Sequence, residues 1–374
     1  MATVEHSKKE AFVRASLRDS IPRYKALLIR LAAIVISLII CAFLIYYITK
    51  INPLKVYQAM FEGAFGSVRR SWITVRDTMM LLCIAVGLAP AFKMKFWNIG
   101  AEGQILVGGI TTAACMIYLK SLPTWLLFIC MIVSSCIAGA LWGLLPAFFK
   151  AKWNTNEILF TLMMNYVAIQ LTSFFVALWE NPYGSNTVGV INQNSHEGWL
   201  GYIFGDNMLF GQEYSLNVII VMTLTILMFV YLKYSKHGYE IAVIGDSQNT
   251  ARYAGISVNK VIIRTMLISG AVCGLSGFLA VSGASHTIST STAGGKGFTA
   301  IIVAWLAKFN TLTMIAISVL IVFLEKGAIE IASQYNLNDY VSSMITGIIL
   351  FFILGSEFFI RYKLVFRKRN KEVQ

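Results

Sequence analysis

The sequence lacks the motifs by which many enzymes bind nucleotides or activate a substrate. It contains no Gly-x-x-x-x-Gly-Lys-Ser/Thr loop, no His-Glu-x-x-His and no Gly-x-Ser-x-Gly. Its four histidines are scattered along the chain, and its six cysteines lie in apolar runs without a Cys-x-x-Cys spacing. We therefore expect a protein that is not an enzyme, with no metal site and no cofactor held by this chain.

Charged residues are also scarce. They make up 13% of the 374 residues, against 57% hydrophobic residues, and the mean hydropathy is +0.68. Ordinary soluble domains carry about 25% charged residues. A helix needs about 20 apolar residues to cross a membrane, so this composition predicts an all-α, polytopic protein of the plasma membrane. We expect residues 27–360 to form one transmembrane domain.

Basic residues predict the orientation of the spans. Residues 1–30 carry seven Lys or Arg against three acids, and the tail 361–374 carries six against one, whereas residues 180–214 hold none. Under the positive-inside rule, segments 1–26 and 361–374 are both cytoplasmic and 180–214 is an external loop. About ten spans satisfy this, expected at Leu27–Ile48, Thr78–Phe92, 96–118, Trp125–Phe149, Thr155–Trp179, Leu216–Leu232, Val261–Ser282, Phe298–Phe309, Leu312–Ile331 and Val341–Ile360.

Two glycine-rich segments interrupt the apolar pattern, one in each half of the chain. They are Phe96–Gly109 and Gly283–Gly297. Paired broken or re-entrant helices of this kind surround the midplane path of many transporters. The sequence therefore predicts broken or re-entrant segments beside a path.

Several of the polar residues in or near the predicted spans are candidates for the wall of such a path, since polar groups in a membrane are costly unless they face a cavity or one another. The candidates are Asn98, Glu102, Gln104, Asn156, Glu157, Asn165, Gly294 and Gly295. Structural roles remain open beside this one. Asn98 and Gln104 could satisfy the backbone of a broken helix, Glu102 could pair with Lys93 or Lys95, Asn156 and Glu157 could cap a helix, and Asn165 could bond between helices.

The long polar stretch 236–259, within the loop 233–260, is expected on the cytoplasmic side. Asp246 can serve as the N-cap of a short helix that continues to Ala254, and Gly255 sits where a left-handed C-terminal glycine belongs. A transport path without energy-coupling chemistry of its own needs energy from another protein. We expect this short helix to be the contact through which that energy reaches the chain.

Three stretches resemble the permeases of bacterial ABC importers in the ribose, branched-chain amino acid and nucleoside group. They are Phe96-Trp97-Asn98-Ile99-Gly100-Ala101-Glu102-Gly103-Gln104, Thr155-Asn156-Glu157-Ile158 with Thr161-Leu162-Met163-Met164-Asn165-Tyr166, and Gly245-Asp246-Ser247-Gln248-Asn249-Thr250-Ala251-Arg252-Tyr253-Ala254-Gly255-Ile256. The resemblance extends over about residues 30–360 and is closest to the nucleoside (simple-sugar) type.

This resemblance implies a permease subunit with several partners. They are a second permease, identical or paralogous, two cytoplasmic ATPase subunits that bind ATP and Mg, and an external substrate-binding lipoprotein. The residues that it implies for ATPase coupling are Gly245, Asp246, Ser247, Asn249, Ala251, Arg252, Ala254 and Gly255. The ribose-type loop usually has Asn after its acidic or glycine position, so Ser247 and Gln248 put the specificity for the ATPase in doubt.

Two alternative functions remain at this point. A simple-sugar permease of the same group would share these motifs. An ion-coupled secondary carrier would need no partner, but it requires a buried ion site, and intramembrane acids are few in this sequence.

Overall fold

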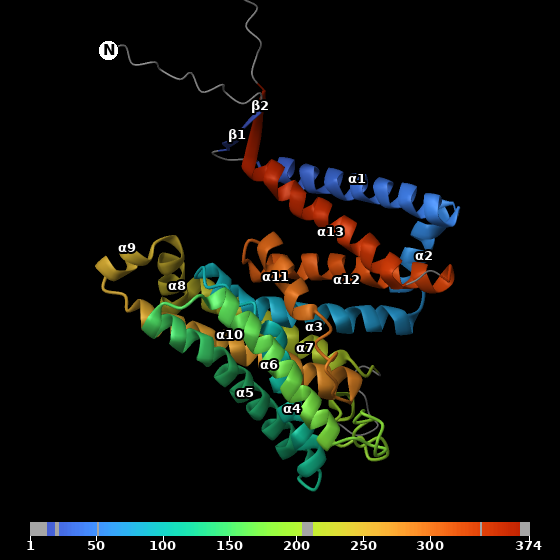
Figure 1. Ribbon diagram of the computed structural model, residues 1–374, viewed down its shortest axis with the longest axis vertical. Helices are drawn as coiled ribbons and strands as arrows, with labels where there is room; N and C mark the ends of the chain where they lie inside the picture. The colour runs from blue at the N-terminus through green and yellow to red at the C-terminus, as the bar shows by residue number, and fades with distance from the viewer. Residues whose placement is uncertain (1–12, 19–21, 51, 204–211, 337–338, 367–374) are drawn as a thin grey trace, which may run out of the picture. The chain divides into compact units, whose positions relative to one another are not determined.

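The computed structural model describes residues 13–18, 22–50, 52–203, 212–336 and 339–366 (Figure 1). The first 12 residues of the predicted cytoplasmic segment, the core of the predicted external loop (204–211) and the last eight residues of the tail lie outside this part. The contacts divide the chain into two compact units, Met1–Gly66 with Leu324–Gln374, and Ser67–Phe323.

Helices dominate both units. They are α1 (Arg23–Thr49), α2 (Pro53–Phe65), α3 (Val68–Lys93), α4 (Ala101–Tyr118), α5 (Thr124–Trp153), α6 (Glu157–Leu178), α7 (Ser215–Tyr234), α8 (Lys236–Asp246), α9 (Gln248–Tyr253), α10 (Val258–Ala280), α11 (Lys296–Leu306), α12 (Thr311–Gln334) and α13 (Asp339–Arg361), with strands β1 (Val13–Leu17) and β2 (Tyr362–Phe366). A 3-10 turn covers Leu200–Tyr202, and a π-helical turn, Val281–Ser285, continues α10.

The first unit joins the two ends of the chain. In it α1 and α13 pack side by side (Figure 1), and Arg30 of α1 forms an ion pair with Glu357 of α13 at 3.0 Å. Strand β1 pairs antiparallel with β2, with Val13 opposite Phe366. The start of α1 and the end of α13 therefore lie on the same side.

The strand pair corrects the all-α expectation. Sequence reasoning treated segment 1–26 and the tail from Arg361 as separate polar ends, whereas five residues of each pair with one another. The sequence near each strand does not predict this pairing, because the partner strand is more than 300 residues away along the chain.

The second unit is a helical bundle in which α4, α5 and α10 pack most closely. Gly274 of α10 lies so near α5 that a Cβ atom there would come within 2.2 Å of the Ser135 carbonyl oxygen. Gly139 of α5 is in the same position, with a Cβ atom 2.3 Å from the Gly270 carbonyl oxygen. Small residues let membrane helices approach to backbone contact, so these glycines determine the distance between α5 and α10.

Seven described helices are long and apolar enough to cross a membrane: α1, α3, α5, α6, α7, α10 and α12. The other three predicted spans also fall on helices, namely α4, the short helix α11 and α13. The expectation of a multi-spanning helical protein is confirmed. The count of ten and the cytoplasmic location of both ends stay predictions.

One predicted span begins at the wrong residue. The second span was expected at Thr78–Phe92, but α3 begins ten residues earlier, at Val68. Ser67 caps it by accepting a hydrogen bond from the Arg70 amide at 3.2 Å. Hydropathy locates the apolar part of a helix and misses a polar first turn, which here carries Arg69 and Arg70.

Candidate functional site

The two glycine-rich segments meet at Glu102, in the first turn of α4. Its carboxylate oxygens accept hydrogen bonds from the backbone amides of Gly295, at 2.7 Å, and Gly297, at 2.9 Å. These amides belong to the beginning of α11, whose N-cap is Gly295 with a φ of +74°. A helix N-terminus carries unpaired amides and a partial positive charge, so Glu102 neutralises the start of α11 from another helix.

The segment before α4 is held by amide side chains. The Asn98 side chain is fully buried, and its Oδ1 accepts a hydrogen bond from the Gly100 amide at 3.1 Å. Its Nδ2 donates to Ser269 Oγ of α10 at 3.2 Å and to Gln104 Oε1 at 3.4 Å. Asn98 and Gln104 thus satisfy backbone and side-chain groups of a broken helix.

Asn165 of α6 holds the same segment from the other side. Its Nδ2 donates to the Ile99 carbonyl at 2.9 Å, and its Oδ1 accepts from the Gly103 amide at 2.9 Å. Thr161, one turn earlier, accepts from the Ile99 amide at 3.3 Å. The interhelix hydrogen bonds that were one of the two readings of Asn165 are confirmed.

Asn156 and Glu157 lie apart from this cluster, at the start of α6. The Asn156 side chain accepts from the Ile158 amide at 3.0 Å, so its capping role is confirmed. Glu157 forms an ion pair with Lys150 of α5 at 2.9 Å. The two residues connect the ends of α5 and α6.

Of the eight predicted path residues, five bond at the start of α4, in two sets of hydrogen bonds that we call together the network around Glu102. Asn98, Gln104 and Asn165 bond to one another or to the backbone of residues 99–103. Glu102 bonds to the amide of Gly295. The alternative pairing of Glu102 with Lys93 or Lys95 is wrong, because its carboxylate bonds to the two glycine amides. Those amides lie 193 and 195 residues away along the chain, whereas both lysines lie within ten residues of Glu102.

A charged group that sequence reasoning missed lies beside the start of α11. Lys296 Nζ is 3.8 Å from Asp77 of α3 and 3.5 Å from Met80 Sδ. Asp77 also pairs with the neighbouring Arg76 at 3.0 Å. The contacts of Lys296 join α11 to α3, as Glu102 joins α11 to α4.

A second polar group outside the spans combines Glu213, His286 and Trp199. His286 Nε2 lies 3.2 Å from Glu213 Oε1, and its ring stacks on Trp199 at a centroid distance of 3.8 Å. The hydrogen bond to His286 lowers the pKa of Glu213 below its usual value, although burial acts in the other direction. The contact ties the loop before α7 to the loop after α10.

The polar stretch 236–259 contains two helices, α8 and α9, at one end of the bundle (Figure 1). The N-cap of α9 is Ser247, whose hydroxyl accepts from the Thr250 amide at 3.3 Å. The assignment of Asp246 as N-cap is wrong, because Asp246 is the last residue of α8. Gly255 follows α9 with a φ of +77°, which confirms the expected left-handed glycine.

Helix α8 is seated on the ends of two spans. A Cβ atom at Gly245 would come within 2.2 Å of the Lys93 carbonyl oxygen, at the end of α3. His237 is hydrogen-bonded through Nδ1 to the Tyr231 hydroxyl of α7. Burial and the positive charge of Arg264 lower the pKa of His237, which favours a neutral ring. Displacement of α8 would therefore act on α3 and α7.

Helix α9 is exposed except for one residue. The side chain of Ala251, within α9, is fully buried. Asn249 and Arg252 of α9 are exposed, as are Ala254 and Gly255, which follow the helix. Of the predicted coupling residues, Gly245 and Ala251 are thus buried against the rest of the chain. Sequence reasoning missed Tyr253, whose side chain is 93% exposed. Tyrosine is enriched among the residues that contribute most to protein–protein binding.

Comparison with known proteins matches residues 73–354 to a family described as "Branched-chain amino acid transport system / permease component". The match covers both the network around Glu102 and helices α8 and α9.

Several curated proteins are similar over most of the chain. The guanosine ABC transporter permease protein NupP of Bacillus subtilis (strain 168) is 28% identical over 90% of this chain and 95% of its own length. The glucose ABC transporter permease protein TsgB13 of Haloferax volcanii is 26% identical over 86% of each chain. The nucleoside ABC transporter permease protein NupB of Lactococcus lactis subsp. cremoris (strain MG1363) is 25% identical over 81% of this chain and 84% of its own length. Second permease proteins of the same Bacillus and Lactococcus, NupQ and NupC, match 62% and 57% of this chain.

Proposed function

Because this chain belongs to the branched-chain amino acid transport system permease family, we propose that it is the permease subunit of an ATP-driven importer of nucleosides. The observation that carries the proposal is the similarity to the guanosine permease NupP over 95% of that protein. The chain is a multi-pass plasma membrane protein and a transport component, and ATP is bound by a separate ATPase in such systems.

The path-forming role proposed for the eight polar and glycine residues is supported for five of them by the position of the network, whereas Asn156 and Glu157 lie apart from it at the start of α6. The network joins two helix beginnings, those of α4 and α11, inside the bundle. The side-chain hydrogen bonds of Asn98 and Asn165 go to the chain itself. We infer that the network shapes the wall of the path, and that affinity for the solute resides in the external lipoprotein.

The coupling role proposed for α8 and α9 is supported by their construction. The exposed side chains of α9 offer a contact surface to an ATPase. The backbone contact of Gly245 with the end of α3 would transmit a displacement of α8 to a span that is largely buried inside the bundle. Closure of the ATPases around ATP would then switch the path between its outward-open and inward-open forms.

Gly255→Pro is expected to abolish ATP-dependent uptake while the protein remains in the membrane. Gly255 has a φ of +77°, whereas proline is confined to about −65°, so the exit from α9 cannot form. Arg252→Glu, a charge reversal on the exposed face of α9, should have the same effect on uptake. Uptake into membrane vesicles driven by internal ATP measures both.

Gly255→Asn is the matched control for the proline variant, because asparagine tolerates the left-handed region better than other residues. It should retain most of the uptake. Nothing lies within 4 Å of a Cβ atom at this position, so the side chain has room. Full uptake in both Gly255→Pro and Arg252→Glu would contradict the coupling role of α9.

The second permease is proposed to be a paralogue. This chain matches NupP and NupB over 90% and 81% of its length, but NupQ and NupC of the same organisms over 62% and 57%. It therefore resembles one member of each pair more than the other. Purification of the tagged chain with its genetic neighbours should recover a second, different permease, two ATPase chains and a lipoprotein. Recovery of an active importer with two copies of this chain would exclude the paralogue.

The solute class is tested on the external lipoprotein. Its thermal unfolding in the presence of nucleosides and monosaccharides should shift upward with the nucleosides. The relative TsgB13 carries glucose in its name, so a simple sugar is the second candidate. A shift with monosaccharides alone would replace nucleosides by sugars and leave the importer assignment intact.

A further inference from the structure

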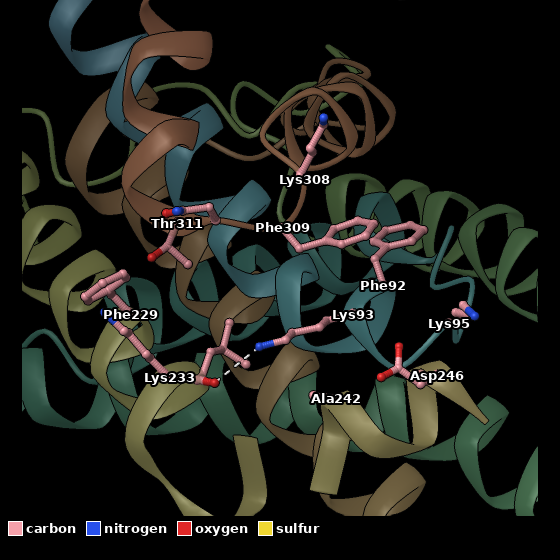
Figure 2. Close-up of a pocket in the computed structure, with 13 residues that line it drawn as sticks. Phe92, Lys93, Lys95, Phe229, Lys233, Ala242, Asp246, Lys308, Phe309 and Thr311 are labelled. Carbon is pink, nitrogen blue, oxygen red and sulfur yellow. Dashed lines mark hydrogen bonds between the residues drawn. The ribbon is translucent and has the colours of Figure 1, made fainter. Parts of the chain in front are cut away.

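We propose that a basic cavity at the ends of α3, α7 and α12 binds a phosphate group, that of an anionic phospholipid. The cavity has a volume of about 470 Å³ and lies beside α8 (Figure 2). The importer assignment does not enter this inference, which concerns a lipid and not the transported solute.

Charge is the first argument. Four lysines line the cavity, Lys93, Lys95, Lys233 and Lys308, against the one carboxylate of Asp246. Four positive charges less one negative charge give a formal sum of +3. Figure 2 shows these side chains distributed around the cavity, with Asp246 on the side of Lys95. Lys93 already donates to the Leu232 carbonyl at 3.3 Å, which holds its ammonium group in place.

A buried hydroxyl is the second argument. Thr311 lines the cavity, is 1% exposed, and has a hydroxyl with no hydrogen-bond partner among the residues that the structure describes. It is also the first residue of α12, a helix of 24 residues. The Asn310 side chain already accepts from the Leu312 amide at 3.1 Å, so what this helix N-terminus offers an anion is mainly its partial positive charge. A phosphate oxygen is an acceptor for the Thr311 hydroxyl.

Position is the third argument. Lys93 is the last residue of α3, Lys233 lies in the last turn of α7, and Thr311 begins α12. All three helices are candidate membrane spans, so the cavity lies at the level of the lipid headgroups. Basic pockets at span ends on the cytoplasmic side bind anionic headgroups, and the positive-inside rule assigns this end of the bundle to that side.

The apolar part of the lining fits the same ligand. Phe92 and Phe309 stack with a centroid distance of 6.3 Å, and Phe229 lines another part of the cavity, beside Lys233 (Figure 2). These rings suit the glycerol and first acyl carbons of a phospholipid. A free phosphate ion has no apolar part to bury against them.

The test measures binding to the purified full-length chain in phosphatidylcholine nanodiscs. The probes are short-chain phosphatidylglycerol, short-chain phosphatidylcholine and inorganic phosphate, and the readouts are the thermal unfolding midpoint and lipid retention in native mass spectrometry. Phosphatidylglycerol should raise the midpoint saturably, and phosphatidylcholine should not. Lys95→Gln combined with Lys233→Gln should weaken this binding by about tenfold or more, the loss expected when a charge-assisted hydrogen bond is removed.

Two further variants test whether the binding depends on the residues of this cavity. Lys152→Gln removes a lysine from the last turn of α5, outside the cavity, and should leave binding unchanged. Thr311→Val should weaken binding although it removes a buried hydroxyl without a partner and so should not destabilise the unliganded chain. Unchanged affinity in Thr311→Val and in the double lysine variant would overturn the site.

The remaining outcomes separate the sources of the anion. An equal shift with inorganic phosphate would overturn the lipid and leave a phosphate site. No shift with any probe, together with loss of ATP-driven uptake in the double lysine variant, would overturn the proposal and assign the lysines to acidic side chains of the ATPase.

Discussion

Glu102→Ala is expected to destabilise the protein by about 2–5 kcal/mol and to reduce uptake to background. The substitution removes the acceptors of the Gly297 amide, which is buried, and of the Gly295 amide, which is partly buried. Each buried donor left without a partner costs about 1–3 kcal/mol. The start of α11 also loses its negative counter-charge. Thermal unfolding of the purified protein and uptake into vesicles measure the two effects.

Glu102→Gln separates charge from hydrogen bonding, because the amide keeps one acceptor oxygen. The free energy of unfolding of Glu102→Gln should lie between those of the wild type and Glu102→Ala. Glu157→Gln is the matched control, since Glu157 is also in the first turn of a helix but bonds to one lysine side chain, that of Lys150, and not to two backbone amides. It should cost less stability than Glu102→Ala. A Glu102→Ala protein with the wild-type unfolding midpoint would contradict the role of Glu102.

Gly274→Ala is expected to destabilise the bundle by about 2–3 kcal/mol, the cost of overpacking a site that cannot yield. The added Cβ atom would lie 2.2 Å from the Ser135 carbonyl oxygen, and a backbone atom cannot move aside as a flexible side chain can. Helices α5 and α10 would have to separate along their whole contact. The yield of folded protein and its unfolding midpoint measure this.

Gly347→Ala makes the same chemical change where nothing lies within 4 Å of the added atom. Position 347 is in α13, and the substitution should be neutral or slightly stabilising there. Equal midpoints for Gly274→Ala and Gly347→Ala would show that the backbone contact between α5 and α10 does not limit their packing.

Features fixed by local chemistry were predictable from the sequence. Asn156 caps a helix that begins one residue later, and Gly255 adopts the left-handed conformation that follows a helix end. Ser247 shows the limit of such reasoning. Asp246 and Ser247 are both good N-caps, and the local sequence cannot choose between them when a preceding helix, α8, ends at Asp246.

Features fixed by distant partners were not predictable. The bonds of Glu102 join residues 193 and 195 positions apart, and nothing near Glu102 in the chain points to Gly295 or Gly297. The backbone contact between α5 and α10 had a signal, because Gly139 and Gly143 are spaced by four residues, as are Gly270 and Gly274. That spacing predicts close packing of a membrane helix, but the packing partner comes only from the structure.

The double hydrogen bond of Glu102 limits how this permease can open. Rotation of α4 and α11 together leaves both bonds intact, whereas separation of the two helices breaks both at once. We therefore expect α4 and α11 to move as one rigid body when the proposed path changes shape, with the remaining helices rearranging around them. In spin-label measurements, the distance between these two helices would stay constant through the ATP cycle while distances to other helices change.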